Sequence, residues 1–142
     1  MEKLKLDLIQ LNKALKTLEN SFNVQRKAVK MDDQEFILAT EDSIIQRFEY
    51  TYEVFWKFLK KYLEVKHHLE DIHSSRRVFY ASVKAQLCTL EEGDVFIVMA
   101  EARNATSHTY SIEGSRDILP GISRYYAAMY AVVERFNKEF VQ

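Results

Sequence analysis

Residues 33–63 read DQEFILATEDSIIQRFEYTYEVFWKFLKKYL, without proline or glycine. Large apolar side chains recur along this stretch at helical spacing, at Ile37, Ile44, Phe48, Tyr52, Phe55, Leu59 and Tyr62. Such a stripe is typical of an amphipathic helix that buries one face. The pattern predicts one long helix from about Asp33 to about Leu63, with Asp32 as its N-cap and Glu35 reaching back to that cap.

The segment before this helix carries a second apolar stripe. Leucines and a phenylalanine alternate at spacings of four and three between Leu4 and Phe22, which predicts another amphipathic helix. The stretch from Asn20 to Lys30 lacks that periodicity and is predicted to be a polar connection. After the long helix, Lys66 to His73 is predicted to be a break that carries three histidines.

Three shorter helices are predicted downstream. Ser75 is expected to cap a helix from Arg76 to about Leu87, and Thr89 with Glu92 has the spacing of a capping box for the next. The turn at residues 113–115 leads to a last helix with apolar positions at Ile118, Ile122, Tyr126, Met129, Val133, Phe136 and Phe140. Its Pro120-Gly121 pair should kink the first turn or delay the start of the helix.

The composition supports a single helical domain over residues 1–142. The chain is 47% hydrophobic and 29% charged, which is typical of a globular protein, and it has three glycines and one proline, too few for a turn-rich β protein. We therefore predict an all-α, antiparallel up-and-down bundle of about five helices. The single Cys88 suits a reducing compartment, and no apolar run reaches membrane-spanning length, so we expect a soluble cytoplasmic protein.

The charge balance limits the partners that the chain can bind. Twenty basic and 21 acidic residues give a net charge of −1. A general electrostatic binder of nucleic acid would be strongly basic, so we expect no DNA binding, and any RNA contact must be local and short.

The stretch from Glu101 to Tyr110, EARNATSHTY, concentrates the reactive side chains of the chain. On a helix Phe96, Met99 and Arg103 share one face, so Arg103 lies at the edge of an apolar stripe. An unpaired guanidinium there would be costly, so it needs an anion. That anion is either a carboxylate of the fold, for which Glu49 and Glu53 are the candidates, or a ligand phosphate.

Arg103 and His108 do not share a helix face, because five residues turn an ideal helix by about 140°. One copy of the stretch is therefore poorly built for a compact two-residue site. Two copies related by a dimer axis could supply arginine and histidine from both sides.

Two blocks of this sequence resemble a known family. Arg103, the four residues between it and His108, and Tyr110 two residues later resemble the signature of HEPN-domain proteins. The stretch from Ile45 to Lys57 is similar to the second-helix motif of the nucleotidyltransferase substrate-binding family, the HEPN partner of minimal nucleotidyltransferases. The family's proline or glycine before the third helix is missing from His73-Ser74-Ser75, which leaves the start of that helix open.

The resemblance implies a toxin-type, metal-independent endoribonuclease that acts as a homodimer without cofactor or metal. His108 would act as the base toward a ribose 2′-OH, Arg103 would stabilise the phosphoryl charge, and Asn104 would orient His108 or a phosphate oxygen. Tyr110 is the position that the resemblance implies for adenylylation by a separately encoded minimal nucleotidyltransferase. Supporting roles are expected for Glu49, Glu53, Trp56 and Ser107.

Other interpretations stay open. The bundle could be a non-catalytic nucleotide- or substrate-binding subunit of a two-component nucleotidyltransferase, or a purely structural bundle with Arg103 in an internal salt bridge. The basic residues Arg76, Arg77 and Lys84 form either a solvated face or a rim that steers phosphates.

Overall fold

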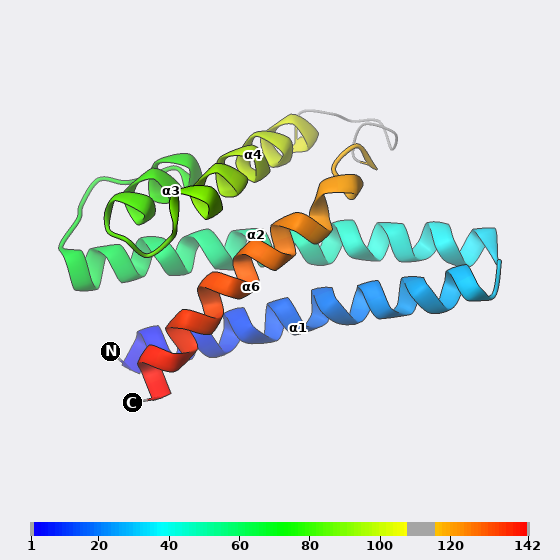
Figure 1. Ribbon diagram of the computed structural model, residues 1–142, viewed down its shortest axis with the longest axis horizontal. Helices are drawn as coiled ribbons and strands as arrows, with labels where there is room; N and C mark the ends of the chain where they lie inside the picture. The colour runs from blue at the N-terminus through cyan, green and yellow to red at the C-terminus, as the bar shows by residue number, and fades with distance from the viewer. Residues whose placement is uncertain (1, 108–115, 142) are drawn as a thin grey trace.

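The computed structural model describes residues 2–107 and 116–141, and this part of the chain forms α-helices joined by short connections. The helices are α1 (Glu2–Lys30), α2 (Gln34–His67), α3 (Ser75–Lys84), α4 (Leu90–Ser107) and α6 (Leu119–Val141). In Figure 1, α1 and α2 form a long antiparallel hairpin, α3 packs against α2 and α4, and α6 crosses the hairpin obliquely. This arrangement confirms the predicted all-α helical bundle.

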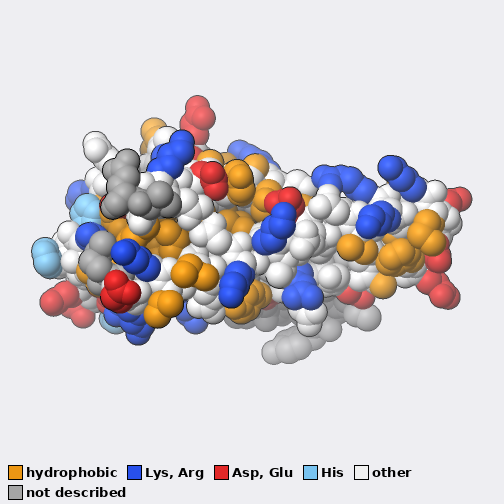
Figure 2. Space-filling model, turned by 90° about the horizontal axis from the view of Figure 1, so that it is seen from below, with side chains coloured by type: hydrophobic (Ala, Val, Ile, Leu, Met, Phe, Trp, Pro, Cys, Tyr) orange, Lys and Arg blue, Asp and Glu red, His pale blue; other side chains and the backbone are white. Residues whose placement is uncertain are grey.

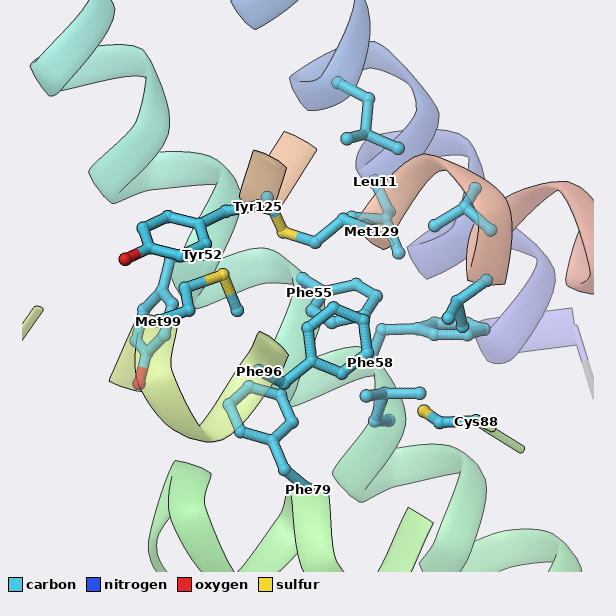
Figure 3. Close-up of a cluster of buried hydrophobic side chains, with 14 of the residues drawn as sticks. Leu11, Tyr52, Phe55, Phe58, Phe79, Cys88, Phe96, Met99, Tyr125 and Met129 are labelled. Carbon is cyan, nitrogen blue, oxygen red and sulfur yellow. The ribbon is translucent and has the colours of Figure 1, made fainter. Parts of the chain in front are cut away.

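An aromatic cluster joins α2, α3 and α4 (Figure 3). The ring centroids of Phe55 and Phe96 are 5.0 Å apart, and those of Phe79 and Phe96 are 5.3 Å apart. All three rings are fully buried, and each contributes about 1.5–3 kcal/mol through burial. Because each helix supplies one of these rings, the cluster fixes α4 against the middle of α2.

Helix α1 continues to Lys30, so the polar connection predicted for residues 20–30 is wrong. This part of α1 buries two small side chains, Ser21 and Ala28, seven residues apart. Small residues let neighbouring helices approach closely but carry little apolar signal, which is why the periodicity is hard to see. Gln25, Arg26 and Lys27 between them favour helix, and no glycine or proline interrupts it.

The start of α2 differs from the prediction by one residue. Asp33, not Asp32, is the N-cap, and its carboxylate accepts a hydrogen bond from the backbone N–H of Phe36 at 3.2 Å. Asp32 has a φ of 53° and belongs to the turn, so it cannot adopt the extended N-cap conformation. Two adjacent aspartates offer the same chemistry, and only the path of the turn selects between them.

The same choice arises at α3, where Ser74 is the cap and the predicted Ser75 is already helical. The Ser74 hydroxyl oxygen accepts a hydrogen bond from the Arg77 N–H at 3.2 Å. The helix ends at Lys84 rather than near Leu87, because Gln86 has a φ of 64° and turns the chain towards α4.

The predicted capping box at the start of α4 is confirmed. The Thr89 N–H donates to the Glu92 carboxylate at 2.9 Å, and the Glu92 N–H donates to the Thr89 hydroxyl at 3.1 Å. Arg135 of α6 adds two hydrogen bonds to the same carboxylate, at 3.0 and 2.5 Å. Burial alone would raise the pKa of Glu92, but the hydrogen bonds from Arg135 and Thr89 outweigh burial and lower it.

Helix α6 begins at Leu119, so Pro120 lies inside the first turn and does not delay the helix. A backbone N–H in the first turn has no helical partner, so proline loses nothing there. The predicted turn at residues 113–115 lies outside the described residues. None of the described helices combines the length and apolarity that crossing a membrane requires.

Candidate functional site

The predicted site residues that the structure describes come from two helices. Glu49, Glu53 and Trp56 lie on α2, and Arg103 and Asn104 lie in the last turns of α4. Ser107 belongs to α4, but its side chain is outside the described part, and so are His108 and Tyr110.

Arg103 contacts both predicted carboxylates. Its Nε lies 3.0 Å from Oε2 of Glu49, and its Nη2 lies 3.9 Å from Oε1 of Glu53. The two glutamates are four residues apart, so they stand one above the other on the face of α2 towards α4. The predicted pairing is confirmed, and it involves both glutamates rather than one of them.

An aromatic ring completes the surroundings of Arg103. Its guanidinium carbon lies 6.0 Å from the centroid of the Tyr52 ring, at the outer limit of a cation–π contact. Tyr52 is buried, and its hydroxyl lies 2.5 Å from the Ser75 hydroxyl. Burial raises the pKa of Tyr52, so the phenol stays neutral at physiological pH. Arg103 is thus linked through Tyr52 to the first turn of α3.

Glu53 is shared among several donors. The Trp56 indole N–H donates to its Oε2 at 3.2 Å, and the Lys57 ammonium lies 3.4 Å from the same oxygen. Arg103 and Lys57 balance the charges of Glu49 and Glu53, so these four side chains have no net charge. The glutamates hold the guanidinium in place, and its side chain keeps 21% of its surface exposed.

A hollow of about 420 Å³ lies between α1 and α2, and Glu53 is part of its lining. Its lining is mixed, with polar and charged side chains beside aromatic and aliphatic ones: Asp7, Gln10, Tyr50, Glu53, Val54, Lys57 and Phe58. The volume is within the range of small-molecule sites. The sequence did not indicate this hollow, because its residues come from two helices with no shared motif.

A second arginine also contacts α2 and was not predicted. Arg116 donates hydrogen bonds to Glu41 at 2.8 Å and to Asp42 at 2.6 Å. A lone arginine just before α6 gives no periodic signal that could reveal this pairing. In the sequence, Arg103 and Arg116 stand on the two sides of the stretch that carries His108 and Tyr110.

Two further observations bear on the chemistry. Arg76 of α3 lies 3.5 Å from Glu101 of α4, which ties the two helices together close to Arg103. Within the described ranges, the histidine, cysteine, aspartate and glutamate side chains form no group of three or more that could hold a metal ion.

Residues 6–138 match the family model described as nucleotidyltransferase substrate binding protein like. A crystal structure of a protein from Thermus thermophilus is similar, with a TM-score of 0.69 and 32% sequence identity. That match covers 88% of this chain and 97% of the other. Comparison with curated proteins finds no match.

Proposed function

This chain belongs to the nucleotidyltransferase substrate-binding protein-like family, and on that premise we propose that it is the HEPN-type partner of a separately encoded minimal nucleotidyltransferase. We further propose that it is a metal-independent endoribonuclease that acts as a homodimer. The observation that supports this function is the placement of Arg103. Two carboxylates of α2 hold the guanidinium at the end of α4, five residues before His108.

The proposed reaction is an attack within the RNA chain. His108 removes the proton of a ribose 2′-OH, and the oxygen forms a bond to the neighbouring phosphorus while the bond to the 5′-oxygen breaks. Arg103 stabilises the negative charge that develops on the phosphoryl oxygens, and Asn104 orients His108 or one of these oxygens. His108 of a second copy returns a proton to the leaving 5′-oxygen. The products carry a 2′,3′-cyclic phosphate and a 5′-hydroxyl.

Glu49 and Glu53 have a positioning role in this scheme. A guanidinium fixed before substrate arrives loses little side-chain entropy on binding a phosphate. Because Lys57 balances the extra carboxylate, the approaching phosphodiester does not meet a net negative cluster. Trp56 restrains Glu53 from the other side.

Tyr110 gives the partner enzyme a means of control. Adenylylation of its hydroxyl would add a bulky, negatively charged group two residues after His108. Like-charge repulsion would then keep RNA phosphates away from Arg103 and His108. Mass spectrometry of protein made with and without the neighbouring nucleotidyltransferase gene tests this control, because modification at Tyr110 should depend on that gene and should lower cleavage.

The central experiment is RNA cleavage by purified, unmodified protein in EDTA. We expect wild-type protein to leave 2′,3′-cyclic phosphate ends, and His108→Ala to cleave at least about 100-fold more slowly. Cleavage that disappears in EDTA and returns with a divalent cation would contradict the metal-independent reaction. A fully active His108→Ala variant would show that His108 is not the base of the proposed reaction.

The second candidate is a non-catalytic subunit that binds a nucleotide or substrate for the transferase. The hollow beside Glu53 favours it, since its volume and mixed lining suit a small polar molecule. Calorimetric titration with nucleotides, compared between wild type and Tyr50→Ala, distinguishes the two functions. Nucleotide binding that needs Tyr50, without any RNA cleavage, would favour the subunit.

A further inference from the structure

The outward face of α3 is basic and contains one exposed aromatic ring. Its members, which we call the α3 face, are Arg76, Arg77, Tyr80 and Lys84. Residues 76, 80 and 84 follow one another at spacings of four, and Arg77 lies beside them. The opposite side of the helix buries Val78, Phe79 and Ser82, so the core fixes the orientation of the α3 face.

Charge is distributed unevenly along the chain, and α3 lies in the positive part. Residues 57–84 contain seven basic and three acidic residues, a net charge of +4, whereas the rest has thirteen basic and eighteen acidic residues, a net charge of −5. The three described histidines also belong to this part and lie at one end of the molecule in Figure 2. The overall charge of −1 therefore hides a basic segment of the chain, to which α3 belongs.

The basic residues of the α3 face differ in their pairing. Arg76 lies 3.5 Å from Glu101. For Arg77 and Lys84, the described residues offer no carboxylate within 4.0 Å, and both side chains are exposed. These two cations can bind an anion without first breaking an ion pair.

Tyr80 adds a surface on which a base can stack. Its side chain is 54% exposed, although large aromatic rings are usually buried. The Arg76 guanidinium lies 5.9 Å from the centroid of its ring and restrains the ring on one side. Exposed aromatic rings beside arginines are the usual means by which proteins hold unpaired bases.

The start of α3 is connected to the Arg103 cluster through contacts with Tyr52 and Glu101. Ser75, next to Arg76, contacts the Tyr52 hydroxyl, and the Arg103 guanidinium lies over the Tyr52 ring. The Arg76–Glu101 ion pair makes a second connection to α4, two residues before Arg103. These contacts place the first turn of α3 beside the end of α4 that carries Arg103.

We propose that the α3 face binds single-stranded RNA next to the phosphate at which Arg103 acts. Arg77 and Lys84 contact successive phosphates, and one unpaired base stacks on Tyr80. This inference rests on the proposed ribonuclease function and names its substrate as unpaired RNA. Two or three phosphate contacts agree with a protein whose overall charge permits only local binding.

The test measures binding separately from cleavage. A fluorescein-labelled 2′-O-methyl RNA oligonucleotide has no 2′-OH to attack and stays intact, so its anisotropy reports affinity alone. The charge reversal Arg77→Glu with Lys84→Glu should weaken binding at least about tenfold and reduce the salt slope by about 1.4, about 0.7 for each lost phosphate contact. Tyr80→Ala should weaken binding about fivefold or more, and Tyr80→Phe should not.

The matched control is Lys27→Glu with Lys30→Glu, which makes the same charge change in the last turn of α1. That turn lies at the opposite end of the hairpin from α3 (Figure 1). The control should bind as wild type, and circular dichroism should show that every variant is folded. If the control and the α3 variant weaken binding equally, the cause is the overall charge of the protein and not the α3 face, and the proposal is overturned.

The remaining outcomes separate the two proposals. Wild-type cleavage of RNA with unchanged binding by the folded α3 variants would overturn this inference and leave the ribonuclease function standing. Binding of the oligonucleotide that depends on the α3 face, without cleavage of natural RNA, would support RNA binding by the α3 face but would overturn the ribonuclease function and, with it, the α3 face as a substrate site. Wild-type protein that fails to bind the oligonucleotide at low salt would overturn the α3 inference directly.

Discussion

Two arginines contact the same helix and have nearly equal exposure, yet their surroundings differ. Arg116 is 22% exposed and makes hydrogen bonds of 2.8 and 2.6 Å to two adjacent carboxylates of α2. Arg103 is 21% exposed and lies 3.0 and 3.9 Å from carboxylates one helical turn apart, one of which also contacts Trp56 and Lys57. An aromatic ring lies beside Arg103 as well.

The difference indicates what each arginine does. Short hydrogen bonds to two carboxylates satisfy Arg116 and attach the chain before α6 to α2. The longer distances at Arg103 describe a guanidinium that is held in place within a wider network. Partial burial and a carboxylate partner are thus found both at Arg116, which is structural, and at Arg103, the candidate site residue. The geometry and the neighbours distinguish them.

The largest expected contrast is in RNA cleavage. Arg103→Ala should slow cleavage by at least about 100-fold, because a donor aimed at developing charge is lost. Arg116→Ala should stay within a few-fold of wild type under the same conditions. Initial rates on one RNA substrate measure both variants. Equal losses would show that the two arginines have the same role and would end the distinction.

A smaller contrast is expected in stability. In double-mutant cycles followed by urea denaturation, the coupling free energy should be about 1–2 kcal/mol for Arg116 with Glu41. For Arg103 with Glu49 it should be about 0.5–1 kcal/mol, because Glu53 lies near the same guanidinium and partly replaces Glu49 when that carboxylate is removed. The reversed pair Arg103→Glu with Glu49→Arg should recover part of the stability lost by either single change. Failure of this rescue would count against the ion pair.

The smallest effect is expected at a third arginine–carboxylate pair, Arg135 with Glu92, at the other end of α4. Glu92→Gln keeps the shape of the capping box and removes only the charge, so it should lower the free energy of unfolding by about 0.5 kcal/mol at pH 7. The pKa of Glu92 is lower in the folded state than in the unfolded state. The contribution of its charge to stability is therefore fully present at pH values above the ordinary carboxyl pKa, and it disappears as the pH falls below about 4. Urea titrations at several pH values measure the difference in free energy of unfolding between wild type and Glu92→Gln. A difference that grows in acid would show that the charge of Glu92 is not its cause.

Local patterns in the sequence predicted much of this structure. The Thr89–Glu92 box and the shared face of Phe96, Met99 and Arg103 depend on residues within two helical turns, and both are confirmed. The choice of Asp33 over Asp32 depends on the path of a turn that either residue could cap. The continuation of α1 past Asn20 depends on close packing of small side chains, which a hydrophobic pattern does not report.

The sequence by itself determined the number and order of the helices that the structure describes, the family and the Arg-His-Tyr spacing, because helical periodicity and motif spacing are local properties of a chain. Tertiary structure decided that both candidate glutamates meet Arg103, that Arg116 pairs with Glu41 and Asp42, and that Ser75 and Arg76 connect α3 to the arginine site. These contacts join residues 23 to 75 positions apart. Their partners are selected by how the helices pack, because many arginines and glutamates could pair and only packing brings particular ones within reach.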